Sequence, residues 1–197
     1  IYSISPTDTP FMSSIGKGKA TATNHEWQTD ALASAVLTNA AVEGDTASDA
    51  TLGVTTRAGN KTQISQKTVK ISGTLEAVDK AGRKSEKAYQ LAKASAEIKR
   101  DMETTLLSNQ ASTNGSSSSA RKLGGLQTWL ATNGDFGTNG VAGASGTTTR
   151  TNGTNRTFDE ATLKTVVKEV YASGGNPKVL MVNPAHKQLV SAFTGIA

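Results

Sequence analysis

The sequence predicts an α+β fold, and three patterns along its 197 residues indicate it. Apolar residues recur at steps of three and four across residues 85–110, which is the period of one helical face. Segments 25–32 and 62–72 alternate instead between apolar and polar residues, as half-buried strands do. A helix–strand–helix order follows in residues 157–197, which is typical of a mixed domain.

The composition excludes several classes of protein. Hydrophobic residues make up 36% of the chain, charged residues 19% and aromatic residues 5%, and cysteine is absent. Disulfides, thiolate zinc sites and thiol nucleophiles are therefore excluded. No apolar run approaches about 18 residues, so we expect no membrane partner. The net charge of +5 favours phosphate-rich partners only weakly, because the basic residues are dispersed.

Both ends of the sequence indicate part of a longer chain. It begins at Ile1 rather than Met and stops at Ala197 without a terminating signal. We therefore expect further sequence, above all at the C-terminus, and no signal peptide is recognisable.

Residues 1–24 are predicted to form an extended arm. Pro6 and Pro10 disfavour helix in the residues before them, and Phe11 begins the short apolar anchor of the arm. The Gly and Lys residues at 16–19 lack the spacing of a phosphate-binding loop, so a flexible basic turn is favoured there.

Residues 25–73 are predicted to form a long, open β-hairpin. Alternation places Trp27 on one face of its first strand, and Val69 and Ile71 on one face of its second. The residues between the strands, notably 40–59, are small and polar. Because an isolated two-stranded hairpin is marginal in water, it must rest on the rest of the chain or on another subunit.

A long one-sided helix is predicted for residues 85–110, with Ser85 as its N-cap. At 1.5 Å per residue it would extend roughly 39 Å, which suits a strut better than a compact bundle. Two oppositely charged pairs stand four residues apart on its polar face: Lys93 with Glu97, and Lys99 with Glu103.

Residues 111–156 are predicted to be mostly surface loop. They are rich in Ser, Gly, Asn and Thr, and four Asn-Gly steps supply tight turns. A short amphipathic anchor over residues 123–130 interrupts the loop, and the stretch 131–156 follows as a surface excursion.

Ordered structure returns in the C-terminal part of the chain. Thr157 and Glu160 fit a capping box at the start of a helix. The continuous apolar run at 179–182 predicts a buried strand. Asn183 is then the expected N-cap of a second helix, with Pro184 in its first position.

The sequence contains little that supports catalysis. The only histidines, His25 and His186, lack metal-ligand spacing, and no Gly-x-Ser-x-Gly motif is present. Asp45 and Asp49 have the spacing of two calcium ligands without the rest of that loop. We therefore predict no enzymatic activity, no cofactor and no metal site.

Six sequence blocks give the chain a resemblance to the major capsid proteins of tailed bacteriophages, which have the Hong Kong 97-type fold. The blocks are those at residues 4–11, 25–32, 60–64, 78–83, 100–103 and 181–184. The order of parts resembles that family too: a polar arm, a long open hairpin, a long helix and a mixed domain. The resemblance covers nearly the whole chain and is weakest across 133–156.

The resemblance implies a role for each part of the chain. It implies an N-terminal arm at 1–24, an extended loop at 25–73, a peripheral domain with a spine helix at 74–110, and a partial axial domain at 111–197. The implied function is a structural subunit that self-assembles into hexamers and pentamers of an icosahedral shell around phage double-stranded DNA. Such a protein is made in the bacterial host cytoplasm and resides in the virion. Portal, scaffold or decoration proteins are further partners that the resemblance admits.

The hairpin and arm supply the residues that we expect between subunits. Trp27 is the foremost, because a large aromatic on a polar ribbon is typical of an interface hot spot. The alternative is that Trp27 packs inside its own subunit. The full expected set is Phe11, Trp27, Gln28, Asp30, Leu32, Gln63, Ile64, Val69 and Ile71.

Two other functions remain open at this point. A phage tail or cell-surface binding module would use the Ser-, Thr- and Asn-rich loops as its contact surface. A DNA-binding protein would show an affinity that falls steeply with salt, but the basic residues form no stripe.

Overall fold

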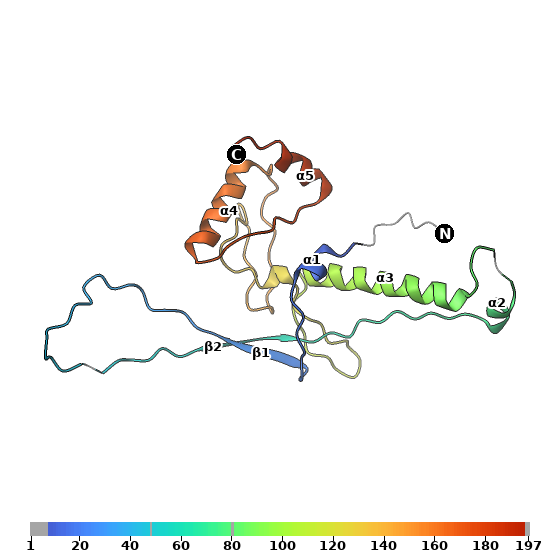
Figure 1. The fold of residues 1–197 in the computed structure, drawn as a ribbon, viewed down its shortest axis with the longest axis horizontal. Coiled ribbons are helices and arrows are strands. Elements are labelled where there is room, and N and C mark those ends of the chain that lie inside the picture. The colour runs from blue at the N-terminus through green and yellow to red at the C-terminus, as the bar shows by residue number, and fades with distance from the viewer. Residues whose placement is uncertain (1–7, 48, 80, 196–197) are drawn as a thin grey trace.

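The computed structural model describes residues 8–47, 49–79 and 81–195, which form an elongated molecule of mixed helix and strand (Figure 1). An open loop extends to one side and a long helix to the other, while the last two helices form a separate lobe above them. The elements in chain order are α1 (Pro10–Ser14), β1 (Asn24–Thr29), β2 (Thr56–Lys61), α2 (Gly73–Ala77), α3 (Glu86–Leu107), η1 (Leu126–Thr128), α4 (Glu160–Ala172) and α5 (Pro184–Ser191).

The hairpin is present, but its second strand was predicted in the wrong place. β1 and β2 pair in antiparallel register, with Asn24 opposite Lys61 and Thr29 opposite Thr56. Residues 62–72, predicted to be that strand, are irregular. Just beyond the ladder, the Thr62 N–H still donates to the Thr23 carbonyl (2.9 Å), while the Thr62 carbonyl accepts a hydrogen bond from Arg121 Nε (2.6 Å) in the body of the molecule.

The long helix is confirmed. Its cap is Ser85, whose side chain accepts a hydrogen bond from the Ala88 N–H (3.1 Å). α3 ends at Leu107, three residues earlier than predicted. The side chains of Asn109 and Gln110, which follow it, donate to the carbonyls of Arg150 and Leu123. Its 22 residues extend about 33 Å. The Lys93–Glu97 pair is present at 3.9 Å.

The arm is not wholly extended, because α1 forms within it. Pro10 occupies the first helical position, where its missing N–H costs nothing. The next two N–H groups, from Phe11 and Met12, each donate to one carboxylate oxygen of Glu103 at 2.8 Å. Glu103 therefore caps α1 from α3, and the predicted pairing of Glu103 with Lys99 does not form. The predicted turn at Pro6 lies outside the described residues.

Helix α2 was not predicted, and it prepares the start of α3. Ser72 caps α2 by accepting a hydrogen bond from the Leu75 N–H (3.2 Å). The Glu76 carboxylate then accepts bonds from the Ser85 hydroxyl (2.7 Å) and from the backbone N–H groups of Glu86 and Lys87 (both 3.0 Å). The first turn of α3 is thus capped both by Ser85 and by a carboxylate from α2.

The two C-terminal helices form as expected, with one change of cap. Asn183 caps α5 by accepting a hydrogen bond from the His186 N–H (2.8 Å), and Pro184 is its first residue. α4 is capped by Asp159, which accepts from the Thr162 N–H (2.8 Å), rather than by Thr157. Asp159 prevails because an ionised carboxylate accepts more strongly than a hydroxyl.

The buried strand predicted at 179–182 is wrong. These residues have no regular secondary structure and pair with no strand among the described residues, and Val179, Leu180 and Met181 are exposed. A short apolar run becomes a buried strand only where neighbouring strands cover both its faces and edges. The two-stranded sheet of β1 and β2 is the only sheet in the described residues, and it lies elsewhere.

Residues 111–156 are ordered by short local contacts. η1 forms inside the predicted anchor, and isolated bridges pair Thr113 with Lys122 and Val141 with Thr151. Two of the expected Asn-Gly turns have the Asn in the left-handed region, at Asn133 (φ 55°) and Asn139 (φ 62°).

The chain has no apolar core within the described residues. No hydrophobic side chain there is buried, and the buried polar ones are Glu86 (3% exposed) and Thr128 (0%). The accessible surface is 15731 Å². A compact protein of 20.4 kDa exposes about 8,800 Å², so this chain exposes nearly twice the usual area.

Candidate interaction surface

The base of the hairpin is clamped to the body of the molecule by side-chain amides. Asn60 makes a two-way contact with Gly124: its Nδ2 donates to the Gly124 carbonyl (3.0 Å) and its Oδ1 accepts from the Gly124 N–H (2.8 Å). Gln63 Oε1 accepts from Gln110 Nε2 (3.0 Å) and from the Leu123 N–H (3.2 Å). These bonds join β2 to the segment that follows α3, and so set the direction of the hairpin.

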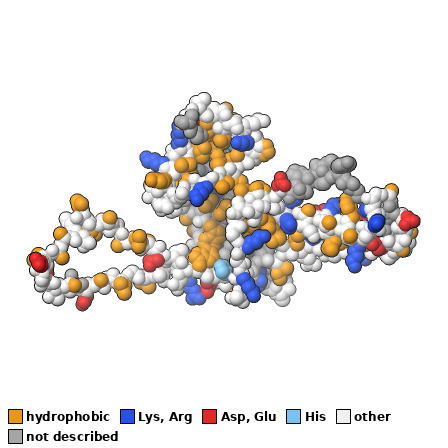
Figure 2. Space-filling view, in the orientation of Figure 1, with side chains coloured by type: hydrophobic (Ala, Val, Ile, Leu, Met, Phe, Trp, Pro, Cys, Tyr) orange, Lys and Arg blue, Asp and Glu red, His pale blue; other side chains and the backbone are white. Residues whose placement is uncertain are grey.

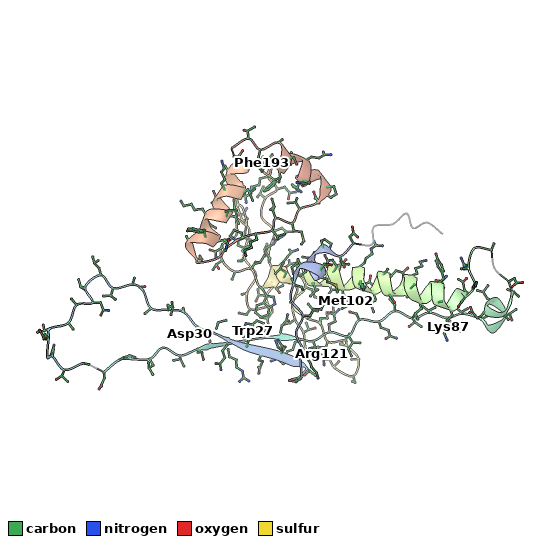
Figure 3. The ribbon with its side chains drawn as sticks, viewed as in Figure 1. Trp27, Asp30, Lys87, Met102, Arg121 and Phe193 are labelled. Atoms are coloured by element: carbon green, nitrogen blue, oxygen red, sulfur yellow. The ribbon has the colours of Figure 1, made fainter. Side chains whose placement is uncertain are left out.

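A second contact at the same junction joins Trp27 to Trp129. The two ring centroids lie 5.1 Å apart with the planes tilted by 43°, an arrangement that aromatic pairs favour. His25 also lies near Trp27, with ring centroids 6.0 Å apart. Figure 3 labels Trp27 near Arg121 at the base of the hairpin, and Asp30 where β1 leads into the open loop.

Glycines allow the segments of the junction to approach closely. Gly146 has φ +72°, and a Cβ there would lie 2.4 Å from Cζ2 of Trp129. The Gly146 N–H donates to the Thr128 carbonyl (3.1 Å), and its carbonyl accepts from the Ser112 N–H (2.8 Å). At Gly146, backbone therefore packs directly on backbone, and the ring of Trp129 lies against it.

The loop between the two strands, residues 30–55, stands away from the body. Every described residue in it is exposed. Figure 2 shows it as a thin projection with hydrophobic and acidic side chains and no Lys or Arg visible on it. Its exposed large hydrophobic side chains are Leu32, Val36, Leu37, Val42, Leu52 and Val54. We call this segment the finger.

Beyond the hairpin, the chain returns alongside α3 and is held there by an ion pair. Lys67 Nζ lies 2.9 Å from Asp101 Oδ2. The hydrogen bond to Asp101, followed by its charge, raises the pKa of Lys67 above its ordinary value of 10.5. The pair is solvent-exposed, so it contributes mainly to alignment of the segment with α3.

An open groove of about 710 Å³ separates the N-terminal arm and α3 from the C-terminal lobe. Phe11, Leu107 and Leu126 line one part of it, and Val179 and Met181 line another. Arg150 also lines the groove, and its Nε is buried without a hydrogen-bond partner. The unpaired apolar run at 179–182 therefore borders a cleft and not a sheet.

The structure brings only some of the expected contact residues together. Trp27 is 37% exposed and packs on Trp129 of its own chain. Much of its ring is therefore covered inside its own subunit. Phe11 lies against α3, and Gln63 is engaged in the junction.

The other expected contact residues present their side chains to solvent or near it. Leu32, Ile64, Gln28 and Asp30 are exposed. Val69 is also exposed, and Ile71 is half-buried. Gln28 Oε1 also accepts a bond from the Thr55 hydroxyl (3.2 Å) across the mouth of the hairpin.

Sequence reasoning missed the residues that hold the junction together. Asn60 belongs to the block at residues 60–64 that carries part of the resemblance, but no local sequence pattern predicts its contact with Gly124, 64 residues away. Arg121 and Asn109 are likewise used by distant backbone groups, on Thr62 and Arg150. The available signal was the presence of two amide side chains, Asn60 and Gln63, at the end of β2 and just beyond it.

Within the described ranges, no group of three or more His, Cys, Asp or Glu residues is placed to hold a metal ion. His25 and His186 lie on β1 and α5. In the same ranges, no helix is long and apolar enough to span a bilayer.

Comparison with known proteins identifies similar chains. The model of the family described as SU10 major capsid protein matches residues 1–197. The chain is also 36% identical over 226 residues to a protein named major capsid protein from Escherichia phage Phieco32. That match covers 98% of this chain and 63% of the relative, so the chain spans less than two thirds of the relative's length.

Proposed function

This chain belongs to the SU10 major capsid protein family, and from that premise we propose that it is a structural subunit of a bacteriophage head shell. Copies of the chain associate into hexamers and pentamers, which close into an icosahedral shell around double-stranded DNA. The protein works by distributed contact area and performs no chemical reaction.

The observation that carries this proposal is the missing core. No hydrophobic side chain is buried among the described residues, and the chain exposes nearly twice the surface of a compact protein of its mass. Exposure of apolar side chains to water is unfavourable in free energy, and association with other chains removes that exposure. Much of this surface must therefore be covered by other copies or by further sequence of the same protein.

The finer architecture that we propose is the Hong Kong 97-type fold. In it, residues 1–24 form the N-terminal arm, 25–73 the extended loop, 74–110 the peripheral domain and 111–197 part of the axial domain. Helix α3 supports this assignment, since it forms a strut of about 33 Å beside a long hairpin. The unpaired run at 179–182 supports an incomplete axial domain that more chain would finish.

Within this architecture, the finger and the arm provide the contacts between subunits. Leu32 on the finger and Ile64 just after β2 are exposed apolar residues, and Gln28 and Asp30 lie at the mouth of the finger. The exposed third of Trp27 remains available to a neighbour, while the rest of its ring packs on Trp129. Val69, Ile71 and Phe11 complete the proposed contact set.

The proposed partners beyond the subunit itself are less specific. Packaged DNA would meet the shell through non-specific contacts, which the +5 charge favours modestly. Portal, scaffold and decoration proteins are candidates that electron microscopy of whole heads would reveal. The proposed location is the virion, after synthesis in the host cytoplasm.

The test of this function is assembly of the full-length natural protein. Negative-stain electron microscopy, beside light scattering after size exclusion, is expected to show closed shells or hexameric and pentameric capsomers. A monomer at high concentration that forms no larger species with a crowding agent contradicts the proposal. In that case the Ser-, Thr- and Asn-rich loops would be tested for glycan binding.

A deletion variant tests the role of the finger. Removing residues 31–54 and closing the strands with an Asn-Gly turn keeps β1, β2 and the junction. We expect a folded subunit, judged by circular dichroism, that builds no shells. Normal shells from this variant would show that the finger is not the extended loop.

A further inference from the structure

Four Asn-Gly steps lie in residues 111–156, at Asn114, Asn133, Asn139 and Asn152. Such a step is chemically reactive, because glycine has no side chain to shield its backbone nitrogen from the carboxamide of the preceding asparagine. The attack requires a free N–H, a free carboxamide and enough backbone freedom to bring the two reacting atoms together. The four steps differ in all three respects.

The fold restrains the steps at Asn133 and Asn139. Asn133 has a left-handed backbone (φ 55°), and its Oδ1 accepts a hydrogen bond from the Ser173 hydroxyl (3.0 Å). Asn139 is left-handed too (φ 62°), and there the attacking nitrogen is occupied, because the Gly140 N–H donates to the Gly137 carbonyl (3.1 Å). Each step must lose a hydrogen bond before it can react.

The step at Asn152 is restrained on both its side chain and its backbone. Its Oδ1 accepts a hydrogen bond from Arg150 Nη2 (3.0 Å). The backbone of Gly153 is packed so closely that a Cβ there would lie 2.3 Å from the Phe136 carbonyl oxygen. Rotation of this peptide towards the carboxamide therefore requires neighbouring backbone to move.

The step at Asn114 lacks these restraints. Asn114 and Gly115 are exposed, and neither has a positive φ. Among the described residues, the Asn114 carboxamide and the Gly115 N–H have no hydrogen-bond partner. Gly115 is also the least crowded of the four glycines, since the nearest atom to an added Cβ is the Arg121 backbone nitrogen at 3.0 Å.

We propose that Asn114 is a site of spontaneous deamidation in this protein. The Gly115 backbone nitrogen attacks Cγ of Asn114 and forms a succinimide ring. The bond from Cγ to Nδ2 breaks, and the amide group leaves as ammonia with the proton of the Gly115 N–H. Water then opens the ring at either carbonyl and leaves an aspartyl or an isoaspartyl residue at position 114. The site is independent of the proposed shell function.

The reaction changes the loop that holds the base of the hairpin. Thr113 and Lys122 form an antiparallel bridge through two hydrogen bonds (3.0 and 3.2 Å), and the adjacent Arg121 donates to the Thr62 carbonyl (2.6 Å). Both products place a new carboxylate in the same loop as two basic side chains. The isoaspartyl product also lengthens the backbone by one methylene group directly before Gly115, so we expect it to loosen this bridge.

Peptide mass spectrometry of the full-length natural protein, incubated at neutral pH and physiological temperature, tests the site. Trypsin releases it in peptide 101–121 and the other three steps in peptides 123–150 and 151–156. Deamidation replaces NH2 by OH and is measured as the resulting gain in mass. We expect Asn114 to react at least about ten-fold faster than the other three steps, because they are held away from the reactive geometry.

Incubation in denaturant separates the effect of the fold from that of the sequence. All four steps are Asn-Gly, so we expect their rates to lie within about three-fold of one another once the chain is unfolded.

Asn114→Gln is the matched variant, because glutamine keeps the amide but closes the corresponding larger ring far more slowly. It should leave position 114 unmodified. It should also keep the hydrogen-exchange protection of Thr113 and Lys122 during the incubation, whereas the wild type loses that protection in proportion to the isoaspartate formed.

The assignment is wrong if Asn114 in the folded protein reacts no faster than the other Asn-Gly steps. It is also wrong if the four rates have the same ratios in the folded and the unfolded chain, because the fold then selects nothing. Full protection of Thr113 and Lys122 in the isolated isoaspartyl form would overturn the expected loosening of the bridge.

Discussion

At the scale of single residues, small side chains matter most where the chain packs tightly. Gly146 combines a left-handed backbone with direct contact to the ring of Trp129. Both features exclude a side chain, since a Cβ would be strained by φ +72° and would also collide with the indole. The residue thereby controls how Trp129, and through it Trp27, is seated.

Gly146→Ala is expected to destabilise the subunit by about 1–3 kcal/mol, because strain at φ > 0 adds to the displacement of Trp129. The measurement is thermal unfolding together with tryptophan fluorescence, since the chain contains two Trp residues and they contact each other. Gly18→Ala is the matched control, because nothing lies within 4 Å of its added Cβ and its φ is not in the left-handed region. Equal stability of the two variants would contradict this account of the junction.

At the scale of elements, side-chain caps stabilise the helices, and the carboxylate cap of α4 titrates with pH. Hydrogen bonding from the Thr162 N–H lowers the pKa of Asp159 below its ordinary value of 3.8. The depressed pKa means that ionised Asp159 stabilises α4 above about pH 3.8, and that this contribution is lost as the pH falls through the lower folded-state pKa. Glu160 behaves alike, because Lys164 lowers its pKa.

Asp159→Asn is expected to remove the pH dependence contributed by the α4 cap while keeping the cap itself, because Asn also accepts a hydrogen bond at this position. Melting temperatures of the wild type and the variant should differ most above pH 5 and converge as the pH falls below 3.8. Asn183→Asp, which places a carboxylate on α5, is the reciprocal control and should gain such a dependence. A constant difference between the two proteins from pH 3 to pH 7 would argue against titration of Asp159.

The elements that sequence patterns predicted correctly are those determined by neighbouring residues. Ser85 and Asn183 cap their helices as expected, because a cap involves groups only three residues apart. The second strand and the strand at 179–182 were misplaced because strand pairing depends on distant partners. Thr56–Lys61 looked too small and polar for a strand, yet its register against β1 decides its conformation.

The same distinction explains what was predicted of the interaction surface. The exposed, uncovered hairpin could be expected from its lack of apolar residues, and it stands away from the body as an open loop. The contacts of Asn60 and Gln63 with residues 110–124 could not be predicted, because the partners of a side-chain amide depend on which distant segments the fold brings close to it. Trp27 illustrates both cases, since its half-exposed position followed from alternation but its partner Trp129 did not.

At the scale of the whole molecule, exposure of the finger predicts how the subunit meets proteases. The finger contains no Lys or Arg, so trypsin has no site there, whereas its many Ala and Val residues suit elastase. We expect elastase to cut unassembled subunits within residues 31–54 and to leave assembled shells intact at that place, because docking buries the finger. Mass spectrometry of the fragments, with trypsin digestion as the control, measures this.

Equal cleavage of the finger in subunits and in shells would mean that assembly leaves it in water. Cleavage elsewhere first, for example in the Ser-rich stretch 116–119, would show that the finger is not the most accessible part of the chain. The first result would contradict burial of the finger between subunits, and the second would contradict its place as the most accessible segment.

The clamp at the base of the hairpin also imposes an order in time on biosynthesis. Asn60 bonds to Gly124, which leaves the ribosome 64 residues later, and contacts between such distant residues form slowly. Until that segment has emerged, the finger has no fixed direction. A nascent subunit therefore lacks the contact that sets the direction of its finger until the segment around Gly124 has been synthesised.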